Sequence, residues 1–163
     1  RRCGCCSKAA RAPGRLTAMA GRLTASALLL ACAGGYPECA RLLLEASAAV
    51  GQAQNRGATP LFIASHNGHL ECARLLLAVC AARDQACNNG GTPLLAACRQ
   101  GHLEVAKLLS SYGASRAATP FGTPEEAANR EGHADLAAWL VASRGWTPLQ
   151  HLEACPRLAA EEA

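Results

Sequence analysis

The stretch Thr59–Leu77 reads TPLFIASHNGHLECARLLL, and a near copy of it begins 33 residues later at Thr92 as TPLLAACRQGHLEVAKLLS. Moved back by the same interval, it matches Ser26–Leu44 more loosely, with the run CARLLL in both. A fourth copy keeps Thr123-Pro124 and Gly132-His133. A fixed period of this length, containing two short helical patterns, predicts an array of helical repeats.

Each copy contains the signals that start and stop two helices. The hydroxyl of Thr59 can cap a helix, and Pro60 suits the first helical position. Gly68 ends this helix because glycine adopts the left-handed conformation at little cost. A second helix begins near His69, and its apolar stripe can be buried only against a neighbouring unit. The units are therefore predicted to stabilise one another by stacking.

The Thr-Pro-Leu run, the Gly-His pair and the Leu-rich run that follows resemble the ankyrin repeat family, over roughly residues 22–154. The resemblance implies an all-α fold, an ankyrin-repeat solenoid of stacked helix-turn-helix units with about four repeats and a partial fifth. The expected parts are a lead segment over 1–22, repeats over 23–54, 55–87, 88–118 and 119–144, a partial repeat from 145, and a truncated helical end over 155–163. The first repeat is degenerate and is interpreted as an N-terminal cap.

Two positions depart from the pattern of the family, which usually closes the second helix with glycine. Ser47 and Cys80 occupy that place. A left-handed conformation there costs a residue with a side chain about 1 kcal/mol. The Thr-Pro-Leu at Thr147 follows Thr123 too early, because about nine residues of the connecting loop are missing relative to the 33-residue period. The unfinished C-terminal edge is expected to expose apolar surface and to lower solubility.

Composition supports packing by small and aliphatic side chains. Half of the 163 residues are apolar, but only 4% are aromatic. Many of the ten cysteines fall at repeated positions, such as Cys32 with Cys98 and Cys39 with Cys72. They are interpreted as small buried apolar residues rather than disulfide partners. This favours a reducing, intracellular compartment, either cytoplasm or nucleus.

The lead segment 1–22 is basic and contains no acidic residue, so the net charge of +4 comes from it. We expect it to be disordered or partly helical. Its Cys3-Gly4-Cys5-Cys6 cluster could be lipidated or could bind metal, but a zinc site needs about four ligands and no second pair lies at a suitable spacing. The six basic side chains could also hold an anionic polymer or a membrane surface weakly.

Nothing in the sequence predicts catalysis or a cofactor. No nucleophile motif, phosphate-binding loop or metal-ligand cluster occurs. Glu125 and Glu126 lie in a first helical turn, where carboxylates suit the helix dipole. His69, His102 and His133 each follow a repeat glycine, and the resemblance implies structural hydrogen bonds between units. The histidine common after Thr-Pro-Leu in the family is replaced by Phe62 and Leu95.

The resemblance implies a protein–protein interaction module that binds through its concave face and finger-like loops, as a scaffold or adaptor. The expected partner is a protein, and neither nucleic-acid binding nor an integral membrane position is expected. The chain is expected to be monomeric or part of a larger polypeptide. The candidate partner-binding residues are Asn55, Arg56, Ala58, His66, Asn67, Asn88, Asn89, Gly91, Arg99, Gln100, Pro120, Arg130, Glu131, Arg144 and Trp146.

Three of these candidates, Arg56, Arg99 and Arg130, recur at related levels of successive repeats and favour a partner with acidic patches. An alternative is that the array is the recognition arm of a larger enzyme, such as a ubiquitin-ligase subunit or a kinase. In that case the chemistry lies outside this chain.

Overall fold

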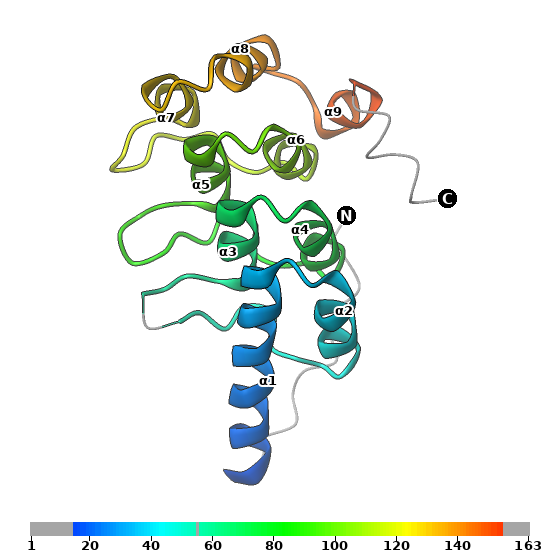
Figure 1. The fold of residues 1–163 in the computed structure, drawn as a ribbon. Coiled ribbons are helices and arrows are strands. Elements are labelled where there is room, and N and C mark those ends of the chain that lie inside the picture. Colours follow the sequence, from blue (N-terminus) through cyan, green and yellow to red (C-terminus); the bar gives the residue numbers. More distant parts are fainter. Residues whose placement is uncertain (1–14, 55, 155–163) are drawn as a thin grey trace.

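The computed structural model describes residues 15–54 and 56–154, which form nine helices (Figure 1). The helices are α1 (Arg15–Gly34), α2 (Pro37–Glu45), α3 (Pro60–Asn67), α4 (Leu70–Ala78), α5 (Pro93–Gln100), α6 (Leu103–Ser111), α7 (Pro124–Arg130), α8 (Ala134–Ala142) and α9 (Pro148–Ala154). Over these ranges the backbone forms no strand, only an isolated bridge between Thr119 and Gly122. The predicted all-α solenoid is confirmed.

The helices stack in two columns. The inner column contains α1, α3, α5 and α7, each packed on the next, and the outer column contains α2, α4 and α6. Three long loops return the chain from the outer to the inner column, and each is numbered after the repeat that it leads into: the second (residues 46–59), third (79–92) and fourth (112–123) finger loops. Figure 1 shows these finger loops extending from the stack beyond the inner column. The inner helices and the finger loops therefore share one face.

The predicted helix signals are confirmed at the inner helices. The hydroxyls of Thr59, Thr92 and Thr123 each accept a hydrogen bond from the backbone N–H three residues on, and proline follows each of them. At Thr123 the Glu126 carboxylate completes a capping box, which confirms a capping role for this acid. Gly68 ends α3 with a left-handed φ of 78°.

The core runs through the stack as a ladder of aliphatic and small side chains. Leu61, Leu94 and Leu109 are buried, and alanines such as Ala73 and Ala106 allow the helices to approach closely. Cys32, Cys72 and Cys98 are buried thiols, as predicted. Burial raises the pKa of both Cys32 and Cys98 to about 12.

The prediction of a buried cysteine is wrong for Cys39, which is exposed. Cys72 contacts Cys32 of the preceding unit. Cys39 holds the same place in α2, but among the described residues no earlier unit covers that side. Cys80 lies beyond the end of α4, where its φ is 62°, and Ser47 has a φ of 61° at the matching place. Both predicted left-handed positions are thus confirmed.

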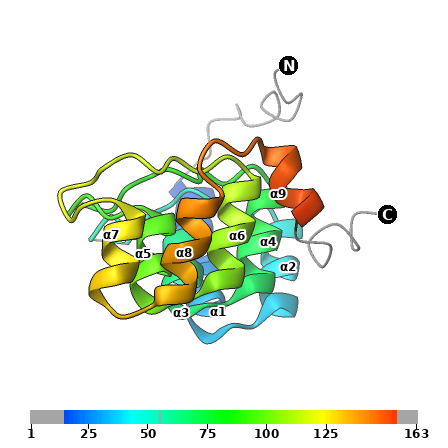
Figure 2. The same ribbon diagram turned by 90° about the horizontal axis from the view of Figure 1, so that it is seen from above.

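The last helix does not continue the stack. A helix does begin after Thr147, as the Thr-Pro-Leu signal predicts, but α9 packs against α6 of the outer column instead of lying on α7. Figure 2 shows it beside α6. Only residues 143–147 join α8 to α9, and this link is too short to form a finger loop and return the chain to the inner column.

Large exposed apolar side chains lie at both ends of the described array. Val141 and Leu149 are exposed at the C-terminal end, as expected. The N-terminal unit exposes more of them, namely Leu23, Leu30, Tyr36 and Leu42. Capping repeats usually have a polar outer face, so this unit is not a polar cap. Within residues 15–54 and 56–154, no helix combines the length and apolar character that crossing a bilayer requires.

Candidate partner-binding groove

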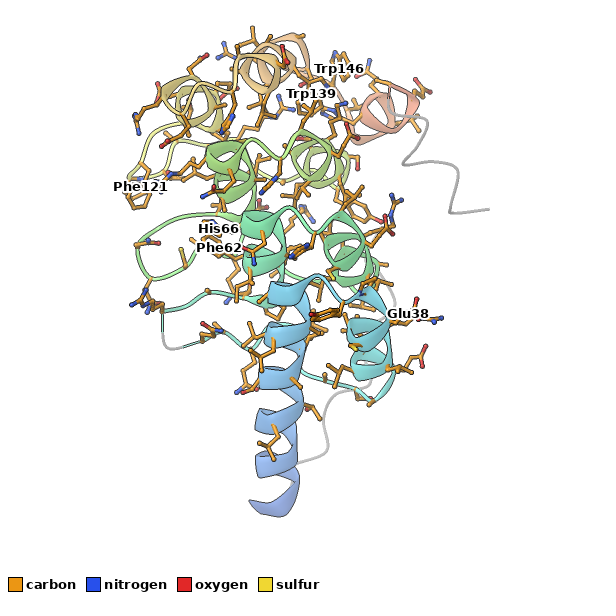
Figure 3. All side chains as sticks on the ribbon, viewed as in Figure 1. Glu38, Phe62, His66, Phe121, Trp139 and Trp146 are labelled. Atoms are coloured by element: carbon orange, nitrogen blue, oxygen red, sulfur yellow. The ribbon has the colours of Figure 1, made fainter. Side chains whose placement is uncertain are left out.

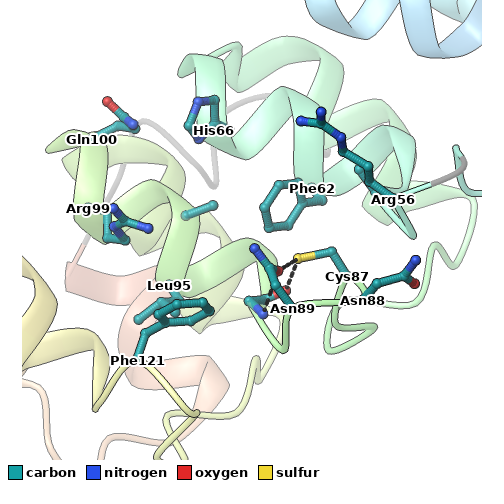
Figure 4. A pocket seen from close by; sticks show the side chains of 13 residues that line it. Arg56, Phe62, His66, Cys87, Asn88, Asn89, Leu95, Arg99, Gln100 and Phe121 are labelled. Atoms are coloured by element: carbon teal, nitrogen blue, oxygen red, sulfur yellow. Dashed lines mark hydrogen bonds between the residues drawn. The ribbon is translucent and has the colours of Figure 1, made fainter.

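A groove of about 480 Å³ lies where the inner helices α3 and α5 meet the finger loops (Figure 4). Its lining comes from the second, third and fourth repeats. The lining residues are Arg56, Ala58, Phe62, His66, Cys87, Asn88, Asn89, Gly91, Leu95, Ala96, Arg99, Gln100 and Phe121. We call this hollow the finger groove.

The finger groove brings together more than half of the residues predicted to bind a partner. They are Arg56, Ala58, His66, Asn88, Asn89, Gly91, Arg99 and Gln100. Asn55 and the Cys3–Cys6 cluster lie outside the described residues, as do the first fourteen residues of the lead segment and the C-terminal end over 155–163. Whether the gathered residues touch a partner stays a prediction.

The finger loops are held together by hydrogen bonds. The N–H of Asn88 donates to the backbone oxygen of Arg56 at 3.0 Å, which joins the second finger to the third. The N–H of Cys87 donates to the oxygen of Gly91 at 2.9 Å, and the Cys87 thiol donates to the side-chain oxygen of Asn89. The tip of the third finger is therefore a closed turn with defined side-chain positions.

The apolar part of the finger groove was not among the predicted site residues. Phe62 of α3 stacks on the ring of His66 with 6.3 Å between centroids. Leu95 of α5 lies beside Phe121 of the fourth finger loop (Figure 4). A signal for two of them was present, because Phe62 and Leu95 replace the histidine of the family pattern. Figure 3 shows Phe62, His66 and Phe121 on the finger-loop side of the stack.

The charged side chains in the finger groove are all basic. Arg56 and Arg99 contribute guanidinium groups, and no aspartate or glutamate is among the lining residues. The Arg99 guanidinium lies 6.0 Å from the centroid of the Phe121 ring. Its Nε atom is 3.8 Å from the nearer carboxylate oxygen of Glu131, and both side chains are about half exposed, so this ion pair is weak.

The other predicted residues make contacts within the array. Asn67 donates to the backbone oxygen of Ala33 at 2.9 Å, and the Pro120 ring lies against Gly90. Arg130 is not in the groove. Its guanidinium donates to the backbone oxygen of Phe121 at 3.4 Å and so supports the fourth finger loop. The predicted row of three arginines is thus divided, with Arg56 and Arg99 in the groove and Arg130 outside it.

Arg144 and Trp146 lie at a second, polar cavity to which α6, α7, α9 and the loops between them contribute. It is lined by Ser110, Gly113, Ala114, Arg116, Thr123, Glu125, Ser143, Arg144, Gly145, Trp146 and His151. Arg144 pairs with the buried carboxylate of Glu125 at 3.5 Å. The ring centroids of Trp139 and Trp146 lie 5.6 and 5.3 Å from that of His151. Figure 3 shows the two tryptophans close together near α9. These contacts fix α9 in place.

Arg116, which the sequence analysis did not single out, completes the end of α8. In α2, α4 and α6 the third-last carbonyl accepts a backbone N–H, for example Leu109 from Ala114 at 3.0 Å. In α8 the equivalent oxygen, that of Leu140, accepts from Nη1 of Arg116 at 2.9 Å. Nη2 donates to the hydroxyl of Ser143 at 3.0 Å, and the guanidinium lies over the Trp139 ring. Burial lowers the pKa of Arg116.

Burial also lowers the pKa of His151, and the positive charge of Arg116 lowers it further. The Nδ1 atom of this ring is buried without a hydrogen-bond partner among the described residues. Its position between the two tryptophans nevertheless makes it the central packing residue of α9.

The described residues contain no group of three or more His, Cys, Asp or Glu side chains that could hold a metal ion. Two columns of helices joined by finger loops, with a threonine cap on α3, α5 and α7, define a helical repeat protein. A family model of three ankyrin repeats matches residues 28–120, more than half of the chain. The chain therefore belongs to the ankyrin repeat family. Comparison with curated proteins gave no match.

Proposed function

We propose that this chain binds a protein partner through the finger groove and the exposed tips of its finger loops. Ankyrin repeats are generally protein–protein interaction modules and are typically not catalytic. The observation that supports the proposal is a division of labour among the residues. Thr59 and His102 make hydrogen bonds that build the array, whereas the side chains of Phe62 and Arg99 line one groove.

The composition of the finger groove suits recognition. Aromatic and arginine side chains contribute strongly to binding at protein interfaces. Phe62, Phe121, Arg56 and Arg99 provide them here, with amide side chains at the rim. Because backbone hydrogen bonds already hold the loops, little conformational entropy remains to be lost on binding.

We further propose that the chain acts as a scaffold or adaptor in the cytoplasm or nucleus. Cys32 and Cys72 touch each other and are thiols, which suits a reducing compartment. If the array is the recognition arm of a larger polypeptide, the finger groove would serve the same purpose and any chemistry would lie elsewhere.

Affinity capture with quantitative mass spectrometry tests the proposal. The wild-type chain is compared with the double variant Phe62→Ala/Arg99→Ala in the groove. The matched control is Glu104→Ala/Lys107→Ala, which removes an exposed ion pair of 2.9 Å on the outer column. We expect the groove variant to lose captured proteins that the wild type and the control retain. Equal capture by all three chains would contradict the proposal.

A further inference from the structure

We infer that the finger groove recognises an extended acidic peptide segment in which one large apolar side chain is flanked by carboxylates. This inference rests on the proposed function and adds the chemistry of the partner. It depends on the order in which apolar and charged side chains follow one another along the groove.

The middle of the groove is apolar. Phe62 and Phe121 come from different elements, α3 and the fourth finger loop, and Leu95 of α5 lies beside Phe121 with only 2% of its surface exposed. Figure 4 shows the Phe62 ring facing the space above Leu95 and Phe121. Two aromatic rings and a leucine form a slot that an aromatic or large aliphatic side chain can fill, and burying such a side chain contributes about 1.5–3 kcal/mol.

The ends of the groove are basic. In Figure 4, Arg56 and Arg99 lie on opposite sides of Phe62. The lining residues include no carboxylate that would compete for them inside the groove. Arg99 has a distant partner in Glu131, but at 3.8 Å with both groups exposed this contact is easily exchanged for a carboxylate of the bound segment. A partner with negative charge on both sides of its apolar side chain therefore complements the groove.

The rim favours an extended backbone. Asn88, Asn89 and Gln100 present amide groups along the opening. The side-chain oxygen of Asn89 accepts from the Cys87 thiol, so its NH2 group is turned to donate elsewhere. Side-chain amides donate to and accept from backbone peptide groups. An extended peptide segment exposes these groups, whereas a helix uses them internally.

A phage-displayed library of random twelve-residue peptides tests the inference without assuming a spacing. We expect selected sequences to share one large apolar residue with Asp or Glu on both sides. Binding is then measured by fluorescence polarisation with labelled Gly-Asp-Glu-Phe-Glu-Asp-Gly. The comparison peptides are Gly-Asp-Glu-Ala-Glu-Asp-Gly, Gly-Asn-Gln-Phe-Gln-Asn-Gly and Gly-Lys-Lys-Phe-Lys-Lys-Gly. Loss of the phenylalanine or of the charges should each weaken binding at least about tenfold.

Variants of the chain separate the two contributions. Phe62→Ala/Phe121→Ala should reduce the preference for phenylalanine over alanine, and Arg56→Glu/Arg99→Glu should shift the preference to the lysine peptide. Lys107→Ala on the outer column should bind like the wild type. The inference is overturned if selected peptides show no acidic pattern, if the neutral and acidic peptides bind equally, or if poly-glutamate binds as tightly as the phenylalanine peptide. Should no peptide bind while affinity capture still depends on Phe62 and Arg99, the inference fails but the proposed function stands.

Discussion

The Nε2 atom of His102 lies 3.1 Å from the backbone oxygen of His66 in the preceding repeat. A carbonyl oxygen can only accept, so Nε2 carries the proton and donates. His69 makes the same bond to Ala33, and His133 makes it to Arg99, each at 3.1 Å. The structural role predicted for these three histidines is thus confirmed.

Replacing His102 should loosen the contact between the second and third repeats. His102→Ala removes the hydrogen bond to His66 and also uncovers Gly68, against which the imidazole packs. We expect a loss of about 1–2 kcal/mol in the free energy of unfolding, measured by urea denaturation. His66→Ala is the control because the bond uses only the backbone of His66. If both variants were equally destabilised, the imidazole contact would not be the cause.

Glycine at Ser47 should stabilise the array. Ser47 has a φ of 61°, a region that costs a residue with a Cβ atom about 1 kcal/mol, and glycine avoids this cost. Ser47→Gly should raise the free energy of unfolding by up to about 1 kcal/mol. Ala46→Gly, one residue earlier at a φ of −74°, should lower it. Thermal denaturation followed by circular dichroism distinguishes the two signs.

Arg116 should be essential for the last described units. Arg116→Ala leaves the oxygen of Leu140 and the hydroxyl of Ser143 without this donor and removes the group stacked on Trp139. We expect the free energy of unfolding to fall by about 2–3 kcal/mol in urea denaturation, because the lost hydrogen bonds come from a charged group. Arg116→Lys should retain only part of the stability that Arg116→Ala loses, since lysine has no planar fork of donors. Arg130→Ala, which removes one exposed bond of 3.4 Å, is the control and should cost under about 0.5 kcal/mol.

Docking of α9 should weaken in acid. The pKa of His151 is lowered in the folded chain, so the unfolded chain binds the proton more readily. The stability that this group contributes is complete above its ordinary pKa of about 6.5 and is lost as the pH falls below that value. Trp139 and Trp146, the two tryptophans of the chain, both flank His151, so their fluorescence reports α9 directly. We expect a transition below about pH 6.5 that His151→Asn abolishes; a transition that survives would have another origin.

The buried cysteines should resist alkylation. Thiolates react and thiols do not, and burial raises the pKa of Cys32 and Cys98 to about 12. Cys39 is exposed on α2. With iodoacetamide at pH 8, peptide mass spectrometry should find Cys39 modified while Cys32 and Cys98 remain unmodified until urea is added. Equal labelling rates in the folded chain would show that the first repeats open readily.

Local rules were enough to predict the repeated helices. The capping and stop signals at Thr59, Pro60 and Gly68 depend only on residues a few positions away, so the sequence alone identifies them. The place of α9 depends instead on how far residues 143–147 can reach once the fourth unit is built. The role of Arg116 could not be predicted for the same reason. The carbonyl of Leu140 requires its guanidinium only because the chain turns away from α8 without the usual backbone bond.

The candidate groove was predictable in part. Arg56, Arg99 and Asn89 stand at places that vary between repeats, and counting positions within the 33-residue period finds them. Phe121 lies in the fourth finger loop, which is shorter than the two before it, so the period does not say where its ring points. Arg99 lies over that ring in the groove, and Arg130 donates to the backbone oxygen of Phe121.

The side-chain and turn bonds that tie one unit to the next join residues no more than 36 positions apart. Once α4 has emerged from the ribosome, both residues of the bond between His69 and Ala33 have already been synthesised. Such a chain can assemble during its own synthesis, each new unit settling on a finished one. If the chain were pulled from its two ends, it would unfold one unit after another, in extension steps of similar length.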